Sequence, residues 1–374
     1  MRFTVSSSVL NSRLQALARV INSKNSLPIL DCFLFEVADD SLTITSSDSE
    51  NVMCSAISLE SCDGNGAFAL PNRTILDAVK ELPEQPLIFD LDQETLALKV
   101  LYQNGMYQLC AQNADEYPRV QPMPENANVI VIDSGRLLEN LSRSLFATAQ
   151  DELRPVMNGV YFDLTPDCLA IVASDGHKLV RNKLFSITTE VPASFILPKK
   201  PASLLKNVMT KSDGDVIIRF YDRSAEVVFD GGSLSCRLIE GRYPNYNSVI
   251  PQDNPNVITI DRRSLIGALR RVLPFASESS QLVRLHIEAG KLELTSEDID
   301  FSTSAKETLV CDYAGQSMNI GFKGGSLSEI LTNMDGDEVV IQLADPSRAG
   351  IIMPVTQPEN EDVLMLIMPM LLND

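Results

Sequence analysis

The chain has 374 residues, of which 44% are hydrophobic and 22% are charged, a composition typical of a globular protein and not of a disordered or fibrous one. No stretch approaches the roughly 18 consecutive apolar residues of a membrane span, and the N-terminus leads into a strand pattern instead of a signal peptide, so we expect a cytoplasmic protein with no membrane partner. The net charge of −19 argues against indiscriminate nucleic-acid binding by the chain as a whole.

The first third of the chain combines strand and helix patterns in a definite order. A strand leads into an amphipathic helix over residues 5–21, and two alternating strands surround a turn over 33–48. A short apolar strand then leads into a second helix and a further strand over 69–91. The pair Tyr117-Pro118 lies near the end of this first third of the chain. Hairpins with one buried face and two amphipathic helices predict helices packed against antiparallel sheets.

The same signals recur twice more along the chain, in the same order. They occupy 132–150, 160–175 and 196–220, with Tyr243-Pro244 after them, and then 260–277, 283–298 and 321–343. The three first-helix segments begin 127 and 128 residues apart, each with a Ser or Asp near its start as a possible N-cap. A common period of about 125 residues indicates a triplicated domain.

Pro- and Asn-rich stretches near residues 126–128 and 253–256 suit linkers between the three domains. We therefore predict α+β domains at residues 1–126, 127–253 and 254–374, called here the first, middle and third repeats. Each is expected to carry two helices on antiparallel sheets. The chain has no Rossmann-type glycine fingerprint and no P-loop, which argues against a nucleotide-binding enzyme.

Positive charge is concentrated in the predicted helices. The six helical segments hold 15 basic residues, Lys211 among them, and only 4 acidic ones, a balance of +11 in a chain that carries −19 overall. Helices with one apolar face on a sheet and one basic face outward would form a positive stripe, whereas the acidic remainder discourages binding elsewhere. Such a surface predicts phosphate contacts without base readout, and hence binding that tolerates any sequence.

Four short motifs carry a family resemblance: LPIL at 27–30, SDGHKL at 174–179, GRYP at 241–244 and MPM at 368–370. Over its whole length the chain resembles the β sliding clamp, the beta subunit of the bacterial replicative DNA polymerase III. The resemblance implies a processivity factor with no catalytic site and no cofactor. It also implies a head-to-tail homodimer of six similar domains, which close into a ring that slides on duplex DNA.

The resemblance further implies a pocket between the middle and third repeats that binds a short peptide motif, rich in Leu and Phe. The replicative polymerase catalytic subunit, the clamp loader and other replication and repair proteins would dock there. Residues carried over to this peptide pocket are Arg154, Met157, Ser174, Gly176, His177, Lys178, Leu179, Pro244, Val249, Leu366, Met368, Pro369 and Met370. The chain departs from the family at Met157, where Leu is common, at Leu371, where Arg is common, and in the terminal Asn373-Asp374.

Two further sets of residues are expected to bind DNA and to join the protomers. The resemblance implies duplex contacts at Lys24, Arg73, Gln150, Lys199 and Lys200, and the helix pattern adds Arg13, Arg136 and Arg143. The dimer interface of the family pairs an edge of the first unit with the third. Here this suggests that Tyr107 and Leu109 face Leu273 and Phe275.

Catalytic and metal-binding alternatives have less support in the sequence. Ser174, Asp175 and His177 supply the residue types of a hydrolase triad, but near neighbours on one turn cannot generally adopt its geometry. Two distant histidines and isolated cysteines do not supply a metal site, and the acidic residues near Asp335 lack the calcium-loop pattern. A nuclease would need a set of carboxylates that binds a metal ion, and the sequence shows no such set in repeated or clustered form. An oligomeric protein-interaction scaffold without DNA binding remains the alternative function.

Overall fold

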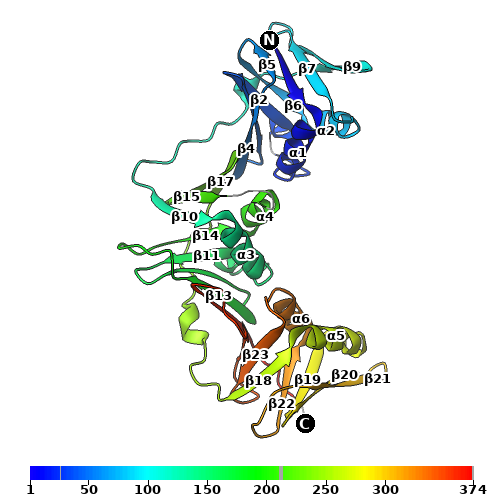
Figure 1. Cartoon of the computed structure of the whole chain (residues 1–374), viewed down its shortest axis with the longest axis vertical. Helices are drawn as coiled ribbons and strands as arrows, with labels where there is room; N and C mark the ends of the chain where they lie inside the picture. The colour runs from blue at the N-terminus through cyan, green and yellow to red at the C-terminus, as the bar shows by residue number, and fades with distance from the viewer. Residues whose placement is uncertain (26, 210–213, 373–374) are drawn as a thin grey trace. The chain divides into compact units, whose positions relative to one another are not determined.

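The computed structural model describes residues 1–25, 27–209 and 214–372. Lys211 and the terminal Asn373-Asp374, which entered the expectations above, lie outside the described residues. The chain forms two compact units, the first made of Met1–Leu138 with Lys200–Leu238 and the second of Glu139–Lys199 with Ile239–Asp374. Figure 1 shows the elements of both units along the chain.

The first unit contains two antiparallel sheets. The five-stranded sheet consists of β1 (Arg2–Ser6), β5 (Ser61–Asp63), β7 (Pro86–Leu91), β8 (Ala97–Tyr102) and β9 (Gly105–Cys110), in the order β5-β1-β7-β8-β9. The eight-stranded sheet consists of β2 (Cys32–Ala38), β3 (Ser41–Ser47), β4 (Asn51–Ser58), β6 (Gly66–Pro71), β10 (Asn128–Asp133), β15 (Asp215–Tyr221), β16 (Ser224–Phe229) and β17 (Gly232–Arg237). Its order is β10-β15-β16-β17-β4-β3-β2-β6.

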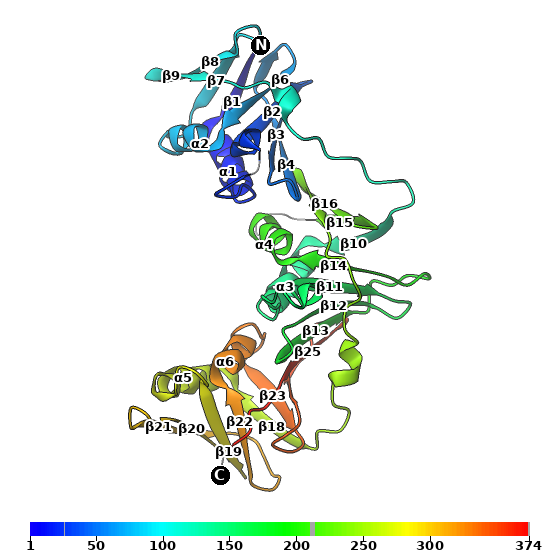
Figure 2. The same cartoon turned by 180° about the vertical axis from the view of Figure 1, so that it is seen from behind.

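Helices α1 (Ser7–Ala18) and α2 (Asn72–Lys80) lie side by side in the first unit (Figures 1 and 2). Leu10, Leu14 and Leu17 of α1 are fully buried, because residues three and four apart share one helical face. The core of this unit is rich in phenylalanine, and the rings of Phe3 and Phe89 stack with centroids 4.8 Å apart. Helix α4 (Lys199–Val208) follows the same pattern, with Leu204 and Leu205 buried.

The second unit repeats this architecture with one eight-stranded and one four-stranded antiparallel sheet. The larger sheet consists of β11 (Gly159–Leu164), β12 (Leu169–Ser174), β13 (Lys178–Leu184), β14 (Ala193–Pro198), β18 (Asn256–Asp261), β23 (Glu338–Leu343), β24 (Gly350–Pro354) and β25 (Glu361–Ile367). Its order is β14-β11-β12-β13-β25-β24-β23-β18. The smaller sheet consists of β19 (Leu282–Glu288), β20 (Lys291–Asp298), β21 (Thr303–Val310) and β22 (Met318–Lys323), in the order β21-β20-β19-β22.

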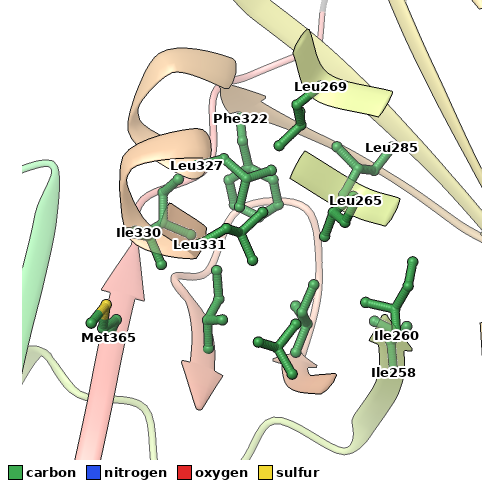
Figure 3. Close-up of a cluster of buried hydrophobic side chains, with 14 of the residues drawn as sticks. Ile258, Ile260, Leu265, Leu269, Leu285, Phe322, Leu327, Ile330, Leu331 and Met365 are labelled. Atoms are coloured by element: carbon green, nitrogen blue, oxygen red, sulfur yellow. The ribbon is translucent and has the colours of Figure 1, made fainter. Parts of the chain in front are cut away.

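Helices α5 (Arg262–Val272) and α6 (Gly324–Thr332) pack together over a continuous apolar core in the second unit. Figure 3 shows Leu265 and Leu269 of α5 directed toward Leu327 and Leu331 of α6, with Phe322 between the two helices. All five side chains are fully buried or nearly so. The remaining helix, α3 (Ser134–Leu145), begins in the first unit and ends in the second.

Local chemistry explains where the first helix of each repeat begins. The side chain of Ser6 accepts a hydrogen bond from the backbone N–H of Val9 at 3.2 Å. At the equivalent positions, Asp133 accepts from the N–H of Arg136 at 2.9 Å and Asp261 from that of Ser264 at 2.7 Å. Each bond satisfies a donor that the first helical turn leaves free, so the predicted N-caps are confirmed.

The predicted α+β class, with two helices per repeat on antiparallel sheets, is confirmed for the described residues. The compact units, however, do not coincide with the repeats. Each eight-stranded sheet takes strands from two neighbouring repeats, which join through the pair β4–β17 in one sheet and β13–β25 in the other. In the parts of the chain that the structure describes, no helix is long and apolar enough to cross a membrane.

Candidate DNA interface, dimer edges and peptide pocket

The turn at residues 174–178, here called the pocket turn, holds most of the motif SDGHKL. The hydroxyl of Ser174 donates to the carbonyl of Lys178 at 2.9 Å and accepts from the N–H of Gly176 at 3.1 Å. Gly176 has a φ of +90°, and a Cβ at this position would lie 2.9 Å from Nη1 of Arg154. The left-handed backbone conformation therefore favours glycine, whereas the guanidinium is the end of a flexible side chain and can move aside.

Asp175 organises the same turn from its centre. Its Oδ1 accepts hydrogen bonds from the N–H groups of His177 and Lys178 at 2.8 and 2.9 Å, and its Oδ2 accepts one from Nζ of Lys178 at 2.8 Å. Burial acts to raise the pKa of this carboxyl, but the hydrogen bonds from Lys178 and His177 outweigh burial and lower the pKa below its usual range. The ionised side chain is thus a structural part of the turn.

Replacement of Asp175 by Asn should destabilise the second unit by about 1 to 3 kcal/mol at pH 7, because the charged acceptor is lost. A lowered folded pKa means that the carboxylate stabilises the fold above its unfolded pKa of about 4, and that this contribution disappears as the pH falls through the folded pKa. Urea denaturation at several pH values should show the two proteins converging in acid. A difference that persists unchanged at low pH would contradict the assigned role.

The residues predicted to form the peptide pocket divide into buried apolar side chains, expected to form its floor, and exposed ones, expected to form its rim. Leu179 and Leu366 face each other across β13 and β25, and both are buried together with Met157. A cluster of buried side chains that includes Tyr243 and Tyr246 packs beneath this pair. The rings of Tyr161 and Tyr243 stack with centroids 4.6 Å apart, a support that the sequence patterns gave no reason to expect.

The C-terminal segment runs from the pocket turn to the small sheet. The N–H of Met368 donates to the carbonyl of His177 at 2.8 Å, and that of Met370 to the carbonyl of Gly321 at 2.7 Å. Met368 and Val249 are exposed at the rim. The remaining predicted pocket residues outside the strands are the exposed Arg154, His177 and Pro244 and the half-buried Pro369 and Met370.

Lys178 differs from the other predicted pocket residues because its charge is already satisfied. Its Nζ contacts the carboxylates of Asp175 at 2.8 Å and Glu329 at 3.2 Å, and the residue is buried. Burial lowers the pKa of the ammonium, but the two carboxylates raise it by more. Lys178 therefore braces the turn against α6. Glu329 was not predicted, since it lies in another repeat and no local pattern links it to the turn.

The predicted duplex contacts are distributed over both units. Arg73, Arg136, Lys199 and Lys200 lie in the first turn of a helix, Arg13 lies in the middle of α1, and Lys24 and Gln150 lie in the segments that follow α1 and α3. Lys24, Arg73 and Gln150 are exposed, and Arg13, Arg136, Lys199 and Lys200 are half-buried. Lys200 is held within the first unit, where its Nζ donates to the carbonyl of Val20 and to Oδ1 of Asn22, both at 2.7 Å, and pairs with Asp48. Its ammonium is therefore less available to a phosphate than that of an unpaired lysine.

Arg143 is a correction to the predicted DNA-binding set. Its guanidinium bonds to Asp335 at 2.6 Å, to Glu361 at 3.0 Å and to Glu139 at 3.2 Å, and the residue is only 5% exposed. All three guanidinium nitrogens are thus directed to carboxylates inside the second unit. We therefore exclude Arg143 from the DNA-facing residues and assign it to the packing of α3 against the third repeat.

The predicted dimer residues lie at or beside free sheet edges. Tyr107 and Leu109, both half-buried, belong to β9, the last strand of the five-stranded sheet. Leu273 and Phe275 form the short helix η6 (Leu273–Phe275), which packs beside β21, the last strand of the four-stranded sheet. Leu273 also packs on the core of the second unit, whereas Phe275 is 40% exposed.

Family models for the DNA polymerase III beta subunit match nearly the whole chain. The N-terminal domain model matches residues 1–121, the central domain model 131–245 and the C-terminal domain model 247–371. The chain belongs to the beta sliding clamp family. The resemblance inferred from the four short motifs is therefore confirmed.

Individual clamps are similar to the chain from end to end. The beta sliding clamp of Pseudomonas aeruginosa is 27% identical over 374 residues, covering 99% of this chain and 100% of that protein, and the clamp of Synechococcus elongatus is 26% identical over 96% of both. Among solved structures, a P. aeruginosa sliding clamp with a ligand has a TM-score of 0.92 at 25% identity, and the beta subunit of Thermotoga maritima a TM-score of 0.89 at 25% identity, each with 100% of both chains covered.

Membership of the clamp family makes the chain a DNA polymerase III processivity factor and a non-catalytic accessory subunit. The geometry of the pocket turn agrees with this function. The hydroxyl of Ser174 points to the carbonyl of Lys178, so its proton is not directed to His177 as a hydrolase triad requires. No group of three or more His, Cys, Asp or Glu side chains among residues 1–25, 27–209 and 214–372 is placed to hold a metal ion.

Proposed function

We propose that two copies of the chain close head-to-tail into a ring around duplex DNA, slide on it without sequence specificity, and tether partner proteins through the peptide pocket. The concentration of basic residues on the helices of all three repeats, in a chain of net charge −19, is the observation that carries this proposal. A closed ring also explains how weak phosphate contacts can be combined with a long residence on DNA.

The proposed protomer contact joins β9 of one copy to β21 of the other. Both strands are sheet edges, and an unpaired edge is a template for another strand unless it is covered. Tyr107 and Leu109 on β9, and Leu273 and Phe275 beside β21, would form the apolar centre of this contact. Because the two edges differ, the contact is head-to-tail, and two such contacts close a ring.

Changing Phe275 to Glu should separate the protomers, because a charge replaces an exposed aromatic side chain at the proposed contact. We expect the dissociation constant to rise roughly 10²-fold, so that light scattering at micromolar concentration gives a mass near 41.1 kDa instead of twice that value. Val191→Glu adds the same charge at an exposed position away from both edges and should leave the dimer intact. A wild-type protein that is already a monomer would refute the ring.

The proposed DNA-facing residues are Lys24, Arg73, Gln150, Lys199, Arg13 and Arg136, with Lys200 contributing less because it is paired. Exchange of Arg73 for Ala should weaken binding to all duplexes alike and reduce the slope of log affinity against log salt by about 0.9, the contribution of one phosphate contact. Fluorescence anisotropy with a short linear duplex at several NaCl concentrations measures this slope.

The same DNA measurement also separates the clamp from a scaffold that binds no nucleic acid. Arg348→Ala removes an arginine that belongs to none of the six helices and should leave the salt slope unchanged. After loading by a clamp loader, the protein should be retained on closed circular DNA at salt concentrations that remove it from linear DNA. Equal loss from circular and linear DNA would favour the scaffold.

The peptide pocket is proposed to bind the replicative polymerase catalytic subunit, the clamp loader and other proteins that carry a clamp-binding motif. Its buried floor and methionine-containing rim support this assignment, since thioether side chains are flexible and adapt to different apolar peptides. We further propose the domain boundaries 1–126, 127–253 and 254–374, and a cytoplasmic location, where replication of a bacterial chromosome takes place.

A further inference from the structure

The pocket turn has a close structural counterpart in the first unit, at residues 47–51. The N–H of Ser49 donates to the hydroxyl of Ser47 at 3.1 Å, as Gly176 does to Ser174 at the same distance. Asp48 accepts from the N–H groups of Glu50 and Asn51 at 3.0 and 2.7 Å, as Asp175 accepts from His177 and Lys178. Each pair of equivalent residues is 127 positions apart, the period of the repeats.

The counterpart extends to the backbone conformation and to the neighbouring strand. Ser49 has a φ of +79°, in the same left-handed region as Gly176, although it carries a side chain that disfavours this conformation. The N–H of Arg237 donates to the carbonyl of Glu50 at 3.0 Å, which matches the bond from Met368 to His177. The chain thus builds the framework of the peptide pocket a second time, where β4 meets β17.

A groove of about 490 Å³ lies on this second framework, and we call it the second groove. Its walls include the turn, the ends of β16 and β17, and the extended segment at residues 118–123. Tyr117-Pro118, at the start of that segment, is the counterpart of Tyr243-Pro244 beside the peptide pocket.

The lining of the second groove differs in chemistry from the peptide pocket. The facing pair Leu179 and Leu366 is replaced by the facing pair Val52 and Ser235, so the floor is smaller and more polar. At the position of Met368 stands Arg237, and Arg119 and Arg223 add two further guanidinium groups. A motif rich in Leu and Phe would therefore find fewer apolar partners here than in the peptide pocket.

The arginine side chains that line the second groove favour an acidic ligand. Three arginines line it against two glutamates. Glu226 already accepts a hydrogen bond from Arg219 at 3.2 Å, and Arg223 pairs with Asp222 at 4.0 Å. This local excess of positive charge stands out in a chain of net charge −19. Exposed Val120 and half-buried Met123 add apolar surface, which a peptide with small apolar side chains would cover and a free phosphate would not.

We propose that the second groove binds an acidic segment of a partner protein, in an extended conformation, with a carboxylate paired to Arg119. The inference builds on the proposed peptide pocket, because the repeated framework is what points to a peptide ligand. The two sites would allow one protomer to hold two segments of different chemistry at once, a Leu- and Phe-rich motif in the peptide pocket and an acidic segment in the second groove.

The test uses the full chain and a fluorescein-labelled peptide of repeating Glu-Ser-Val, with a matched peptide in which Gln replaces Glu. The acidic peptide should bind by fluorescence anisotropy, with an affinity that falls as NaCl is added, and the Gln peptide should bind at least roughly tenfold more weakly. Arg119→Glu, at an exposed position, should weaken the acidic peptide at least about tenfold. Val52→Glu, which places a carboxylate on the floor, should do the same.

Two controls decide whether binding occurs in the second groove. Arg348→Glu makes the same change of charge at an exposed arginine outside the groove and should leave the affinity unchanged. An excess of unlabelled peptide rich in Leu and Phe should not displace the acidic probe. Displacement would place the probe in the peptide pocket. Equal binding of the Gln peptide would show that the site does not recognise the negative charge of the ligand. Either result overturns the inference. Binding of the Leu- and Phe-rich peptide itself reports separately on the proposed function.

Discussion

Substitution of Arg143 by Ala is expected to destabilise the second unit by about 3 to 5 kcal/mol. The guanidinium is buried beside Glu361, whose side chain is only 3% exposed, so removal of Arg143 leaves an uncompensated charge in the protein interior. Asp335 and Glu139 are more than half exposed and can return to water without penalty. Urea denaturation should show an earlier midpoint for the transition of the second unit.

A second variant tests whether the cost arises from the buried charge or from the lost contacts. The double variant Arg143→Met, Glu361→Leu removes both members of the buried pair and should recover most of the stability, because apolar residues of similar size can replace a buried ion pair at little cost. Arg348→Ala removes an exposed arginine paired with Asp345 and should change stability by less than about 1 kcal/mol. An Arg143→Ala protein as stable as the wild type would show that the interior assignment is mistaken.

Loss of both Met157 and Met370 to alanine should reduce the affinity for a Leu- and Phe-rich clamp-binding peptide by roughly 10²-fold. Met370 is half-buried and can contribute about 1.5 kcal/mol of apolar contact when a ligand covers it, and a factor of ten corresponds to about 1.4 kcal/mol. Met157 is already buried, so its truncation acts by leaving a cavity beneath the surface on which the peptide would rest. Isothermal titration calorimetry with the full chain gives the affinity directly, and circular dichroism checks that the variant is folded.

The matched controls separate pocket contacts from general effects on the fold. Met106 is an exposed methionine of β9, and Met106→Ala should leave peptide affinity unchanged. Met157→Leu supplies the residue common in the family and should retain most of the affinity, since the buried volume is nearly conserved. Unchanged affinity in the double alanine variant would count against the assigned pocket walls.

Features that depend on neighbouring residues could be predicted from the sequence. The N-caps at Ser6, Asp133 and Asp261 were predictable because a cap acts on the N–H group three residues ahead. The hairpins and the period of the repeats were also visible, since alternation and self-similarity are local patterns. These local signals were enough to indicate the class of fold and the order of its elements.

Contacts between distant segments could not be predicted in this way. On a helical wheel Arg143 is an ordinary basic residue, and only the fold brings it to Asp335 and Glu361, which lie 192 and 218 positions away in the sequence. The role of Glu329 in holding Lys178 has the same origin. The second groove escapes prediction for another reason: similarity between repeats reveals what they share, whereas the groove depends on how Ser235 and Arg237 differ from Leu366 and Met368.

Because of the strand pairs β4–β17 and β13–β25, the boundaries of the two compact units do not coincide with the boundaries of the three repeats. A middle repeat cut out at residues 127–253 would expose β17 and β13 as open edges, and such edges favour aggregation. Denaturation of the whole chain should therefore proceed through two cooperative blocks, one for each compact unit, and not through three. The three repeats share one pattern of elements, but edge-to-edge strand pairing between neighbours makes the middle repeat dependent on both others for its stability.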